Sequence, residues 1–505
     1  MRPVLRCFPA VLGASAFFAC QPYPAPPASP GPEAFAADSM GIDSVASRLF
    51  ATDLAPGMAV VVVRGDQVIY TRGFGYADRE AGSAVTPETI FYIASTTKAF
   101  TGLTAAILDE EGRFDLDAPL SRYLPTLRLA PTLAADSITI RSLLSHTHGI
   151  GGDGPVVWRT AYTGEFANNE ELIRLLAEHQ PASGGRAYQY GNIGYNVASF
   201  AMDRAMQRPW KDLLAEKIFT PLGMSSTTAY VSRARTDRLA MPYSFEGAGY
   251  LRLPYGKTDA NMQAAGGLVS SARDLGRWLE VQLNGGRVDG RQALSRTAVA
   301  EAQRLQASTD RNQRGMRQIG YSLGWQMVVR GSDTMYVHGG GFTGFATHVS
   351  FYPQERVGVA VMANEGNVGG PLVDLVAAAI YQRLTGATIP GFNSFEEIAA
   401  MIAQQKTGIA ADRARRAARS QVLPLPLDRY TGVFVNPHYG AVELSIVDGR
   451  LYSRAGAAQA PVEVYDAEKN QLRFALSGSG NVVPVEVVDG RVVAFTYQGS
   501  RFARR

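Results

Sequence analysis

Residues 90–112 read IFYIASTTKAFTGLTAAILDEEG, and this stretch decides how the rest of the chain is interpreted. The apolar approach IFYI is typical of a short strand, and the run from Lys98 onward has the composition of a helix. Ser95 and Lys98 are three residues apart, so in the first turn of that helix they lie on one face. The serine hydroxyl then sits at the positive helix end, and a lysine whose pKa is lowered by burial can take its proton.

Lysine is scarce in this chain, which makes the pair informative. Six lysines are present among 49 basic residues, and only Lys98 has a serine three positions before it. A Ser-x-x-Lys pair alone still fits an ordinary helix start followed by a surface lysine. Two further motifs favour catalysis over that explanation.

The second motif is Tyr190-Gly191-Asn192, in YQYGNIGYNVASFAMDR (188–204), where a glycine-bearing loop enters a helix. Tyrosine can relay a proton, and asparagine can hydrogen-bond a substrate amide or position the lysine. The third motif, His338-Gly339-Gly340, ends the strand-like TMYVHGGGFTGF (334–345). Its glycines let a substrate carbonyl approach the backbone closely.

Three motifs in this order and at these separations resemble those of the serine hydrolases of the penicillin-recognising superfamily. The nearest likeness is to class C β-lactamases, low-molecular-weight D,D-peptidases, D-aminopeptidases and related esterases. The stretches GFGYADRE, SLLSHTHGI, IFTPLGMSSTTAY and AAGGLVSSARDLGRW are also similar, so the resemblance covers roughly residues 40–385. It implies an α+β fold of the β-lactamase/transpeptidase type, with a central antiparallel sheet flanked by helices and a helical subdomain. Strand-like segments at both ends of this stretch fit one sheet shared by its first and last parts.

The resemblance also implies roles for the motif residues. Ser95 would be the nucleophile, and Lys98 and Tyr190 would share the general acid/base work. The backbone N–H groups of Ser95 and Gly341 would form the oxyanion hole. The implied substrate-binding and oxyanion residues are Asn192, His338, Gly339, Gly340 and Gly341. We expect no metal and no cofactor.

Two positions depart from the family pattern, namely His338, where most β-lactamases have lysine, and His148 before Gly149, where serine is more usual. Histidine is largely neutral near pH 7, so a permanent partner for a β-lactam carboxylate is missing. We therefore expect a hydrolase of peptides, including those with D-residues, or of esters, with β-lactamase as the alternative. An inactive envelope-binding or sensing protein is the alternative of another class, and the completeness of the motifs disfavours it.

Residues 1–20 predict a signal peptide, because Arg2 and Arg6 precede an apolar run too short to span a bilayer. Cys20 follows a small residue, as in a bacterial lipoprotein box that would attach a lipid anchor. Cleavage after Ala16 or near Ala37 is the alternative. Residues 21–39 form a Pro/Ala-rich tether. We expect an exported protein, whether periplasmic, associated with the cell envelope or secreted.

We expect a hydrolase domain at 40–385, a helical linker at 386–424 and a β-domain at 425–505. In the last of these, Asp448-Gly449 and Asp489-Gly490 mark hairpin turns between short strands, which predicts a small sandwich or barrel. The hydrophobic content of 46% excludes disorder. The net charge of +4 is small for a chain of this length, which argues against nucleic acid as a partner. A small peptide or ester is the expected partner, and the oligomeric state stays open.

Several other short motifs could indicate a different kind of site. Residues 320–324 (GYSLG) fit a nucleophile elbow, but a strand rather than a helix follows. Residues 256–258 (GKT) lack the first glycine of a P-loop. His146 and His148 are two residues apart in a turn without a third metal ligand, and His179 fits a surface position.

Overall fold

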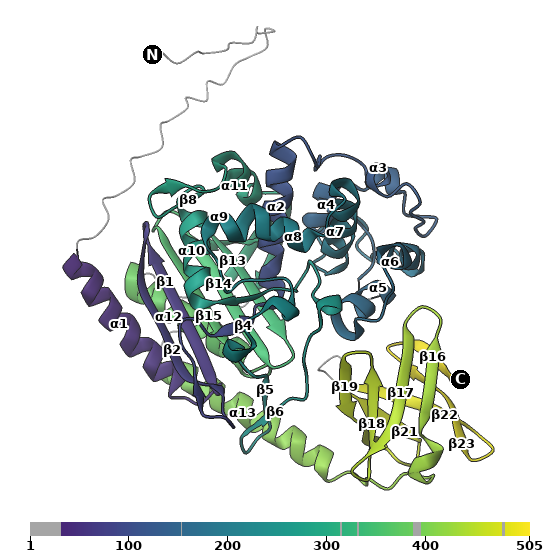
Figure 1. Cartoon of the computed structure of the whole chain (residues 1–505). Helices are drawn as coiled ribbons and strands as arrows, with labels where there is room; N and C mark the ends of the chain where they lie inside the picture. The colour runs from purple at the N-terminus through teal and green to yellow at the C-terminus, as the bar shows by residue number, and fades with distance from the viewer. Residues whose placement is uncertain (1–31, 153, 314–315, 331–332, 387–394, 477–479) are drawn as a thin grey trace.

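The computed structural model describes residues 32–505 except 153, 314–315, 331–332, 387–394 and 477–479. Cys20 and the expected signal peptide therefore lie outside the described residues. A large α+β domain is followed by a long helix and a smaller β-domain (Figure 1). The predicted fold class is confirmed. Within the described part, no helix combines the length and apolar character needed to cross a membrane.

The large domain is built on a nine-stranded sheet with the order β10-β11-β12-β13-β14-β15-β1-β2-β3. Neighbouring strands run antiparallel, and β1 pairs with β15 from Met58↔Ala363 onward, so the two ends of the domain meet in the sheet as predicted. The strands are β1 (Gly57–Arg64), β2 (Gln67–Asp78), β3 (Ser83–Ala84), β10 (Ala307–Gln313), β11 (Met316–Tyr321), β12 (Gln326–Arg330), β13 (Asp333–Phe342), β14 (Phe345–Tyr352) and β15 (Val357–Ala363).

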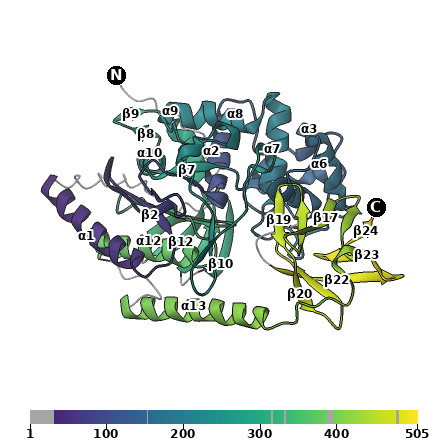
Figure 2. The ribbon, with the colours of Figure 1, turned by 60° about the horizontal axis from the view of Figure 1, so that its bottom comes forward.

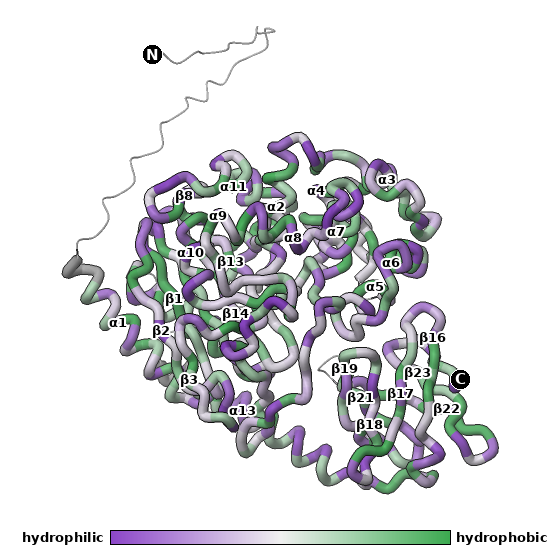
Figure 3. The backbone as a smooth tube through the Cα atoms, viewed as in Figure 1, coloured by the Kyte–Doolittle hydropathy of each residue, from purple (hydrophilic) through white to green (hydrophobic). Residues whose placement is uncertain are grey.

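Both faces of the sheet are covered by helices, and β1 shows this most clearly. Its run of valines is continuously hydrophobic (Figure 3) because alternate side chains enter two different cores. Val61 packs on the side of α10 (Ala272–Leu283), whereas Val60 and Val62 pack on the side of α12 (Gly369–Thr385) and α1 (Pro32–Phe50). Helix α1 begins at Pro32, so helical structure extends into residues expected in the tether.

Helices and short strands fill the chain between β3 and β10. Besides α10, the helices are α2 (Thr97–Glu110), α3 (Leu120–Tyr123), α4 (Ile140–Leu144), α5 (Pro155–Val157), α6 (Asn169–Leu175), α7 (Ile193–Met206), α8 (Trp210–Leu214), α9 (Thr220–Leu222) and α11 (Arg296–Gln303). Short helical turns include η1 (Ala94–Thr96), η3 (Trp158–Thr163) and η8 (Asp259–Asn261). Small strand pairs join β4 (Ile90–Tyr92) to β7 (Val269–Ser271), β5 (Tyr243–Phe245) to β6 (Tyr250–Arg252), and β8 (Arg287–Val288) to β9 (Arg291–Gln292).

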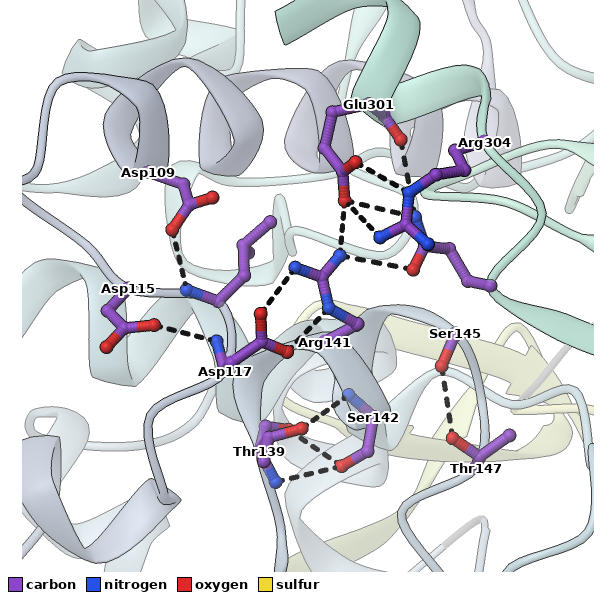
Figure 4. Close-up of polar contacts among 12 residues, drawn as sticks. Asp109, Asp115, Asp117, Thr139, Arg141, Ser142, Ser145, Thr147, Glu301 and Arg304 are labelled. Carbon is purple, nitrogen blue, oxygen red and sulfur yellow. Dashed lines mark hydrogen bonds and ion pairs between the residues drawn. The ribbon is translucent and has the colours of Figure 1, made fainter. Parts of the chain in front are cut away.

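A polar network fastens α4 to α11 (Figure 4). The Arg141 guanidinium donates to both carboxylate oxygens of Asp117, at 2.7 and 2.8 Å, and to the Gln306 side chain at 3.1 Å. It also binds Glu301, which accepts a further hydrogen bond from Arg304 at 2.7 Å. These acidic partners raise the pKa of Arg141 further above its usual range. Since α4 leads directly into residues 145–149, the network fixes the start of that loop.

The long helix α13 (Phe395–Ala417) runs from the large domain to the β-domain (Figure 2). The β-domain is one nine-stranded antiparallel sheet with the order β19-β18-β17-β16-β24-β23-β22-β21-β20. Its two outer strands, β19 and β20, are separated in the chain by Val462 alone, so the sheet must curl until its edges meet. The result is a nearly closed barrel, so of the two predicted alternatives, a sandwich or a barrel, the structure shows the barrel. The strands are β16 (Gly432–Asn436), β17 (Gly440–Val447), β18 (Arg450–Ala455), β19 (Ala458–Pro461), β20 (Glu463–Asp466), β21 (Gln471–Phe474), β22 (Asn481–Val488), β23 (Arg491–Tyr497) and β24 (Ser500–Arg504).

The barrel docks on η3. Trp158 is 3% exposed and belongs to the hydrophobic cluster of the barrel, with its ring centroid 5.4 Å from that of Tyr497. Its indole N–H donates to the Tyr439 carbonyl at 3.1 Å, and the Arg159 Nε–H donates to the His438 carbonyl at 2.7 Å. The barrel and the large domain therefore share buried surface and hydrogen bonds from side chains of η3 to backbone carbonyls of the barrel.

Candidate active site

Ser95 lies in the tight turn η1 between β4 and α2. The residue before it, Ala94, has φ +46, a left-handed conformation that costs energy in a residue with a β-carbon. Two hydrogen bonds hold the turn against the chain before β7: Ile93 N–H donates to the Leu268 carbonyl at 3.0 Å, and Leu268 N–H donates to Thr97 Oγ1 at 3.1 Å. The apolar strand β4 is fully buried, which fixes the approach to Ser95.

Lys98 is completely buried, and its Nζ has three close polar neighbours. It lies 2.9 Å from Asn192 Oδ1, 2.8 Å from the Ala265 carbonyl oxygen and 3.2 Å from Ser95 Oγ. The carbonyl and the amide oxygen can only accept, so they occupy two hydrogens of the amine. The third position on the nitrogen, a hydrogen or the lone pair, faces the Ser95 hydroxyl.

Tyr190 precedes α7, and Asn192 is the residue at its N-cap. The Lys98 nitrogen lies 4.9 Å from the centre of the Tyr190 ring. The tyrosine as a whole is 38% exposed, although the groups around its hydroxyl desolvate it. Burial there raises the pKa of Tyr190 above its usual range, and a hydrogen bond with the Ser95 side chain partly opposes the rise. Tyr190 is therefore a protonated donor at neutral pH.

The third motif lies on β13, beyond the end of its neighbour β12. Pairing with β12 runs from Asp333 to Val337, so His338–Phe342 extend past that strand. A β-carbon on Gly340 would lie 2.2 Å from the Ile93 carbonyl oxygen, so glycine is required for β13 to reach the nucleophile turn. Gly341 is exposed, with open space around it.

His338 is held by two neighbours. Its Nδ1 lies 2.8 Å from the Gly339 carbonyl oxygen, which can only accept, so Nδ1 carries a proton. Its Nε2 lies 3.2 Å from the Tyr321 hydroxyl, which can donate to it. These two contacts fix the orientation of the ring. The structure thus brings all three predicted motifs to one place.

The sequence interpretation missed three partners of these motifs, namely Ala265, Tyr321 and His146. Burial, and then the charge of Lys98, lower the pKa of His146 well below its ordinary value. Its Nδ1 lies 3.4 Å from the Gly191 N–H, and its ring centre lies 4.7 Å from that of Tyr190. His146 therefore packs against Tyr190 and Gly191 of the second motif. The SHTHG stretch was a signal for it, but its role depends on tertiary contacts.

The structure also shows where the residues of the competing motifs lie. Ser322 is fully buried between β11 and β12, and no helix follows it. The surface position expected for His179 was wrong: the residue is 2% exposed, and its Nδ1 lies 3.1 Å from the Gly151 carbonyl oxygen, because the ring packs over Gly154. Among the described residues, no group of three or more His, Cys, Asp or Glu is placed to hold a metal ion.

A second serine–histidine–aspartate arrangement occurs between β14 and α12. His348 Nε2 lies 2.8 Å from Ser350 Oγ, and His348 Nδ1 lies 2.8 Å from Asp374 Oδ1. Ser350 is fully buried and also lies 3.0 Å from the Tyr381 hydroxyl, so no substrate reaches it. We interpret this set as a structural network.

Two cavities in the described part, of about 590 and 350 Å³, are lined by other residues than the three motifs. The larger lies beside β3 and residues 236–241, and the smaller lies between α6, α7 and α8. The motif geometry, and not cavity size, marks the candidate site.

Similarities to known proteins extend over the large domain. The family model described as Beta-lactamase matches residues 46–382. Unguisins hydrolase ungD' of Aspergillus campestris (strain IBT 28561) is 28% identical over 414 residues, covering 76% of this chain and 73% of that protein. The octameric penicillin-binding protein homologue from Pyrococcus abyssi has a TM-score of 0.57 at 21% identity, covering 92% of this chain and 99% of its own. D-amino acid amidase from Ochrobactrum anthropi SV3 has a TM-score of 0.57 at 22% identity, covering 68% and 99%.

At these identities the two solved structures establish likeness of fold. The family match also establishes membership of the family, because it spans over half of the chain. It includes the turn with Ser95, the start of α7 and β13. The chain belongs to the beta-lactamase family of serine hydrolases.

Proposed function

We propose that the protein is an exported hydrolase that cleaves peptides or small amides, including those of D-residues, or esters, through an acyl-Ser95 intermediate. The observation that carries the proposal is the position of Lys98. Its two acceptor contacts, Asn192 Oδ1 and the Ala265 carbonyl, direct the remaining position of the nitrogen at Ser95 Oγ. In the neutral amine that position is a lone pair, which is what a general base needs.

The reaction then follows from the geometry. Lys98 takes the Ser95 proton as Oγ bonds to the substrate carbonyl carbon. The N–H groups of Ser95 and Gly341 stabilise the negative charge that develops on the carbonyl oxygen. Tyr190 gives its proton to the leaving nitrogen or oxygen as the scissile bond breaks, and it is reprotonated from Lys98. Water later attacks the acyl-Ser95 ester, with the same groups acting in reverse.

Two observations favour amides and esters over β-lactams. His338 stands where most β-lactamases have lysine, and a histidine is largely neutral near pH 7, so β13 offers no fixed positive charge at that position. One structural neighbour is a D-amino acid amidase. β-Lactamase activity is the second candidate, and hydrolysis of nitrocefin tests it.

Covalent labelling by a fluorophosphonate probe tests the nucleophile. Ser95→Ala is expected to abolish labelling, whereas Ser350→Ala, which alters the buried Ser–His–Asp set, is expected to keep it. Labelling of the Ser95→Ala protein would contradict the assignment. Loss of labelling in Ser350→Ala with unchanged circular dichroism would move the nucleophile to β14.

A substrate panel separates the remaining possibilities. D-Amino-acid amides, D-Ala-D-Ala peptides, short p-nitrophenyl esters and nitrocefin are each incubated with wild type and with Ser95→Ala. Turnover that depends on Ser95 excludes the inactive envelope-binding or sensing alternative. No turnover of any member, together with no labelling, would favour it.

Export and lipid attachment rest on residues 1–39 of the sequence. Fractionation of cells that express the full chain is expected to place it outside the cytoplasm. Cys20→Ser is expected to release it from the membrane fraction if Cys20 carries the anchor. Unchanged fractionation of Cys20→Ser would favour cleavage after Ala16 or near Ala37.

A further inference from the structure

Helix α2 buries three threonine side chains. Thr97, Thr101 and Thr104 are each at most 1% exposed. A buried hydroxyl needs a hydrogen-bond partner, and a threonine inside a helix can donate to the carbonyl one turn earlier. Thr104 does this, with the Phe100 carbonyl at 3.0 Å. Thr97 and Thr101 differ from it, because each also binds a segment outside the helix.

Both of these hydroxyls bind the chain just before β7. Thr101 Oγ1 donates to the Ala264 carbonyl at 2.9 Å, and the carbonyl of its own helix, that of Thr97, is farther away at 3.4 Å. Thr97 Oγ1 accepts a hydrogen bond from the Leu268 N–H at 3.1 Å. Helix α2 therefore attaches this segment at two points.

The carbonyl of Ala265 lies between the two attachment points in the chain. Its oxygen is 2.8 Å from Lys98 Nζ, so it is one of the two acceptors that direct the lysine at Ser95. Lys98 directly follows Thr97 and precedes Thr101 by three residues, so the three side chains leave neighbouring positions of one helix. The same helix thus carries the lysine and holds the carbonyl that the lysine contacts.

The segment around Ala265 is a tight β-turn, and such a turn can adopt a second conformation. Gly266 N–H donates to the Gln263 carbonyl at 3.0 Å, and the central peptide of the turn carries the Ala264 carbonyl. Flipping that peptide would need a positive φ at Ala265, which the structure does not show. Thr101 binds the Ala264 carbonyl in the observed orientation, so it opposes a flip that would disturb the next carbonyl.

We propose that Thr101 and Thr97 are positioning residues, which hold the Ala265 carbonyl where it directs the Lys98 lone pair at Ser95. They act through the backbone of the turn and not by contact with the substrate. This inference deepens the proposed acyl-serine mechanism and rests on it. Without the two hydroxyls the turn can shift, and the lysine then loses one of the two acceptors that orient it.

The expected signature is a change in how the labelling of Ser95 depends on pH. A fixed carbonyl oxygen favours the ammonium form of Lys98, since hydrogen bonds from a charged donor are stronger. When that acceptor moves away, the neutral amine forms at lower pH, but its lone pair is less well directed. Thr101→Val is therefore expected to move the acidic limb, where the rate rises as the lysine loses its proton, to lower pH. It is also expected to reduce the plateau rate about tenfold.

The measurement is the rate of covalent labelling by a fluorophosphonate across the pH range, which reports activation of the serine without a known substrate. Thr101→Ser keeps the hydroxyl and is expected to keep the wild-type limb and plateau. Thr97→Val removes the second attachment and is expected to move the limb in the same direction as Thr101→Val. It decides the proposal if Thr101→Val does not fold. Thr104→Val is the matched control, because its hydroxyl is equally buried but bonds the carbonyl of its own helix, and it should label like wild type.

The ionisable groups that face Lys98 stay the same in all of these variants. The ring centres of Tyr190 and Tyr195 lie 4.9 and 5.6 Å from its Nζ, and the charge of the lysine contributes to the lowered pKa of His146. The threonine substitutions neither add nor remove a charge. A movement of the limb therefore reports the hydrogen bonds that support the lysine, and not a new electrostatic partner.

A limb and a plateau at the wild-type values in both Thr101→Val and Thr97→Val would overturn the proposal. An equal change in Thr104→Val would also overturn it, because the effect would then be a general disturbance of α2. A lower melting temperature without movement of the limb would mean that the hydroxyls only stabilise the fold. Failure of the hydrolase proposal appears separately, as wild type that is not labelled or as labelling that persists in Ser95→Ala.

Discussion

Gly340 and the Ile93 carbonyl are in direct backbone contact: a β-carbon at position 340 would lie 2.2 Å from the carbonyl oxygen. This contact joins β13 to the turn that carries Ser95, and so it sets the spacing between the two expected oxyanion donors. A side chain here would push the strand and the turn apart.

Gly340→Ala is therefore expected to lower the free energy of unfolding by about 1–3 kcal/mol, the usual cost of overpacking. It is also expected to reduce kcat/KM at least a hundredfold, because the donors separate. Gly341→Ala is the control for stability, since no atom lies within 4 Å of the added carbon. Equal melting temperatures for wild type and Gly340→Ala would contradict the contact.

Asn192→Asp is expected to shift the pH profile of kcat/KM. A carboxylate 2.9 Å from the Lys98 nitrogen favours the ammonium, so the pKa of that lysine rises. The neutral base then forms only at higher pH, and the acidic limb of the profile moves upward in pH. Asn192→Ala is the control, because it removes the same hydrogen bond without adding a charge, and it is expected to lower kcat. If Asn192→Asp also only lowers kcat and its acidic limb stays at the wild-type pH, Lys98 is not the base.

The three motifs that the structure brings together could be predicted because each is short and has fixed spacing. Ser95 and Lys98 are three residues apart, and Asn192 follows Tyr190 by two. The Ala265 carbonyl could not be predicted, since it is 167 residues from Lys98 and a backbone carbonyl has no sequence signature. His146 and Lys257 stood in motifs that the sequence offered as weak metal or phosphate sites, and only tertiary packing shows their neighbours. The burial of His179 could not be predicted, because its ring packs against Gly151 and Gly154, in a loop that is distant from it in the sequence.

The stability of wild type relative to Lys257→Met is expected to depend on pH. The pKa of Lys257 is about 7 in the folded protein and about 10.5 in the unfolded chain, so between these values the unfolded state binds more protons. The contribution of this group to the free energy of unfolding therefore rises with pH across that window, by about 5 kcal/mol at most. Urea unfolding at pH 6.5 and pH 9.5 checks this: the advantage of Lys257→Met should be larger at pH 6.5. A constant difference would mean that the pKa of Lys257 is not lowered.

Arg141→Met is expected to reduce the free energy of unfolding by about 1–3 kcal/mol, because Glu301 and Asp117 lose a charged donor. The side chains of Arg141 and Glu301 are only 20% and 23% exposed, so water replaces the arginine poorly. Arg235→Met is the matched control, because the Arg235–Asp237 pair is 60% exposed on both sides and should leave the denaturation midpoint unchanged. Equal effects of the two variants would show that the network adds nothing beyond a surface pair.

Trp158→Ala is expected to loosen the barrel from the large domain. The change removes a buried ring and its hydrogen bond to Tyr439, at a cost of about 3–5 kcal/mol. Limited proteolysis should then cut faster between α13 and β16. Trp278→Phe, in the core beside α2, keeps the docking surface and should leave that cleavage rate as in wild type. Unchanged cleavage in Trp158→Ala would mean that other contacts hold the barrel.

The antiparallel pairing of β1 with β15 determines when the candidate site can form during synthesis of the chain. During synthesis the nucleophile turn emerges early, but β13, which completes the site, arrives only after the helical subdomain and is locked in through β14 and β15 onto β1. Contacts between such distant segments form slowly. The growing chain therefore carries Ser95 and Lys98 without β13, and in the proposed mechanism hydrolysis starts only when the sheet closes.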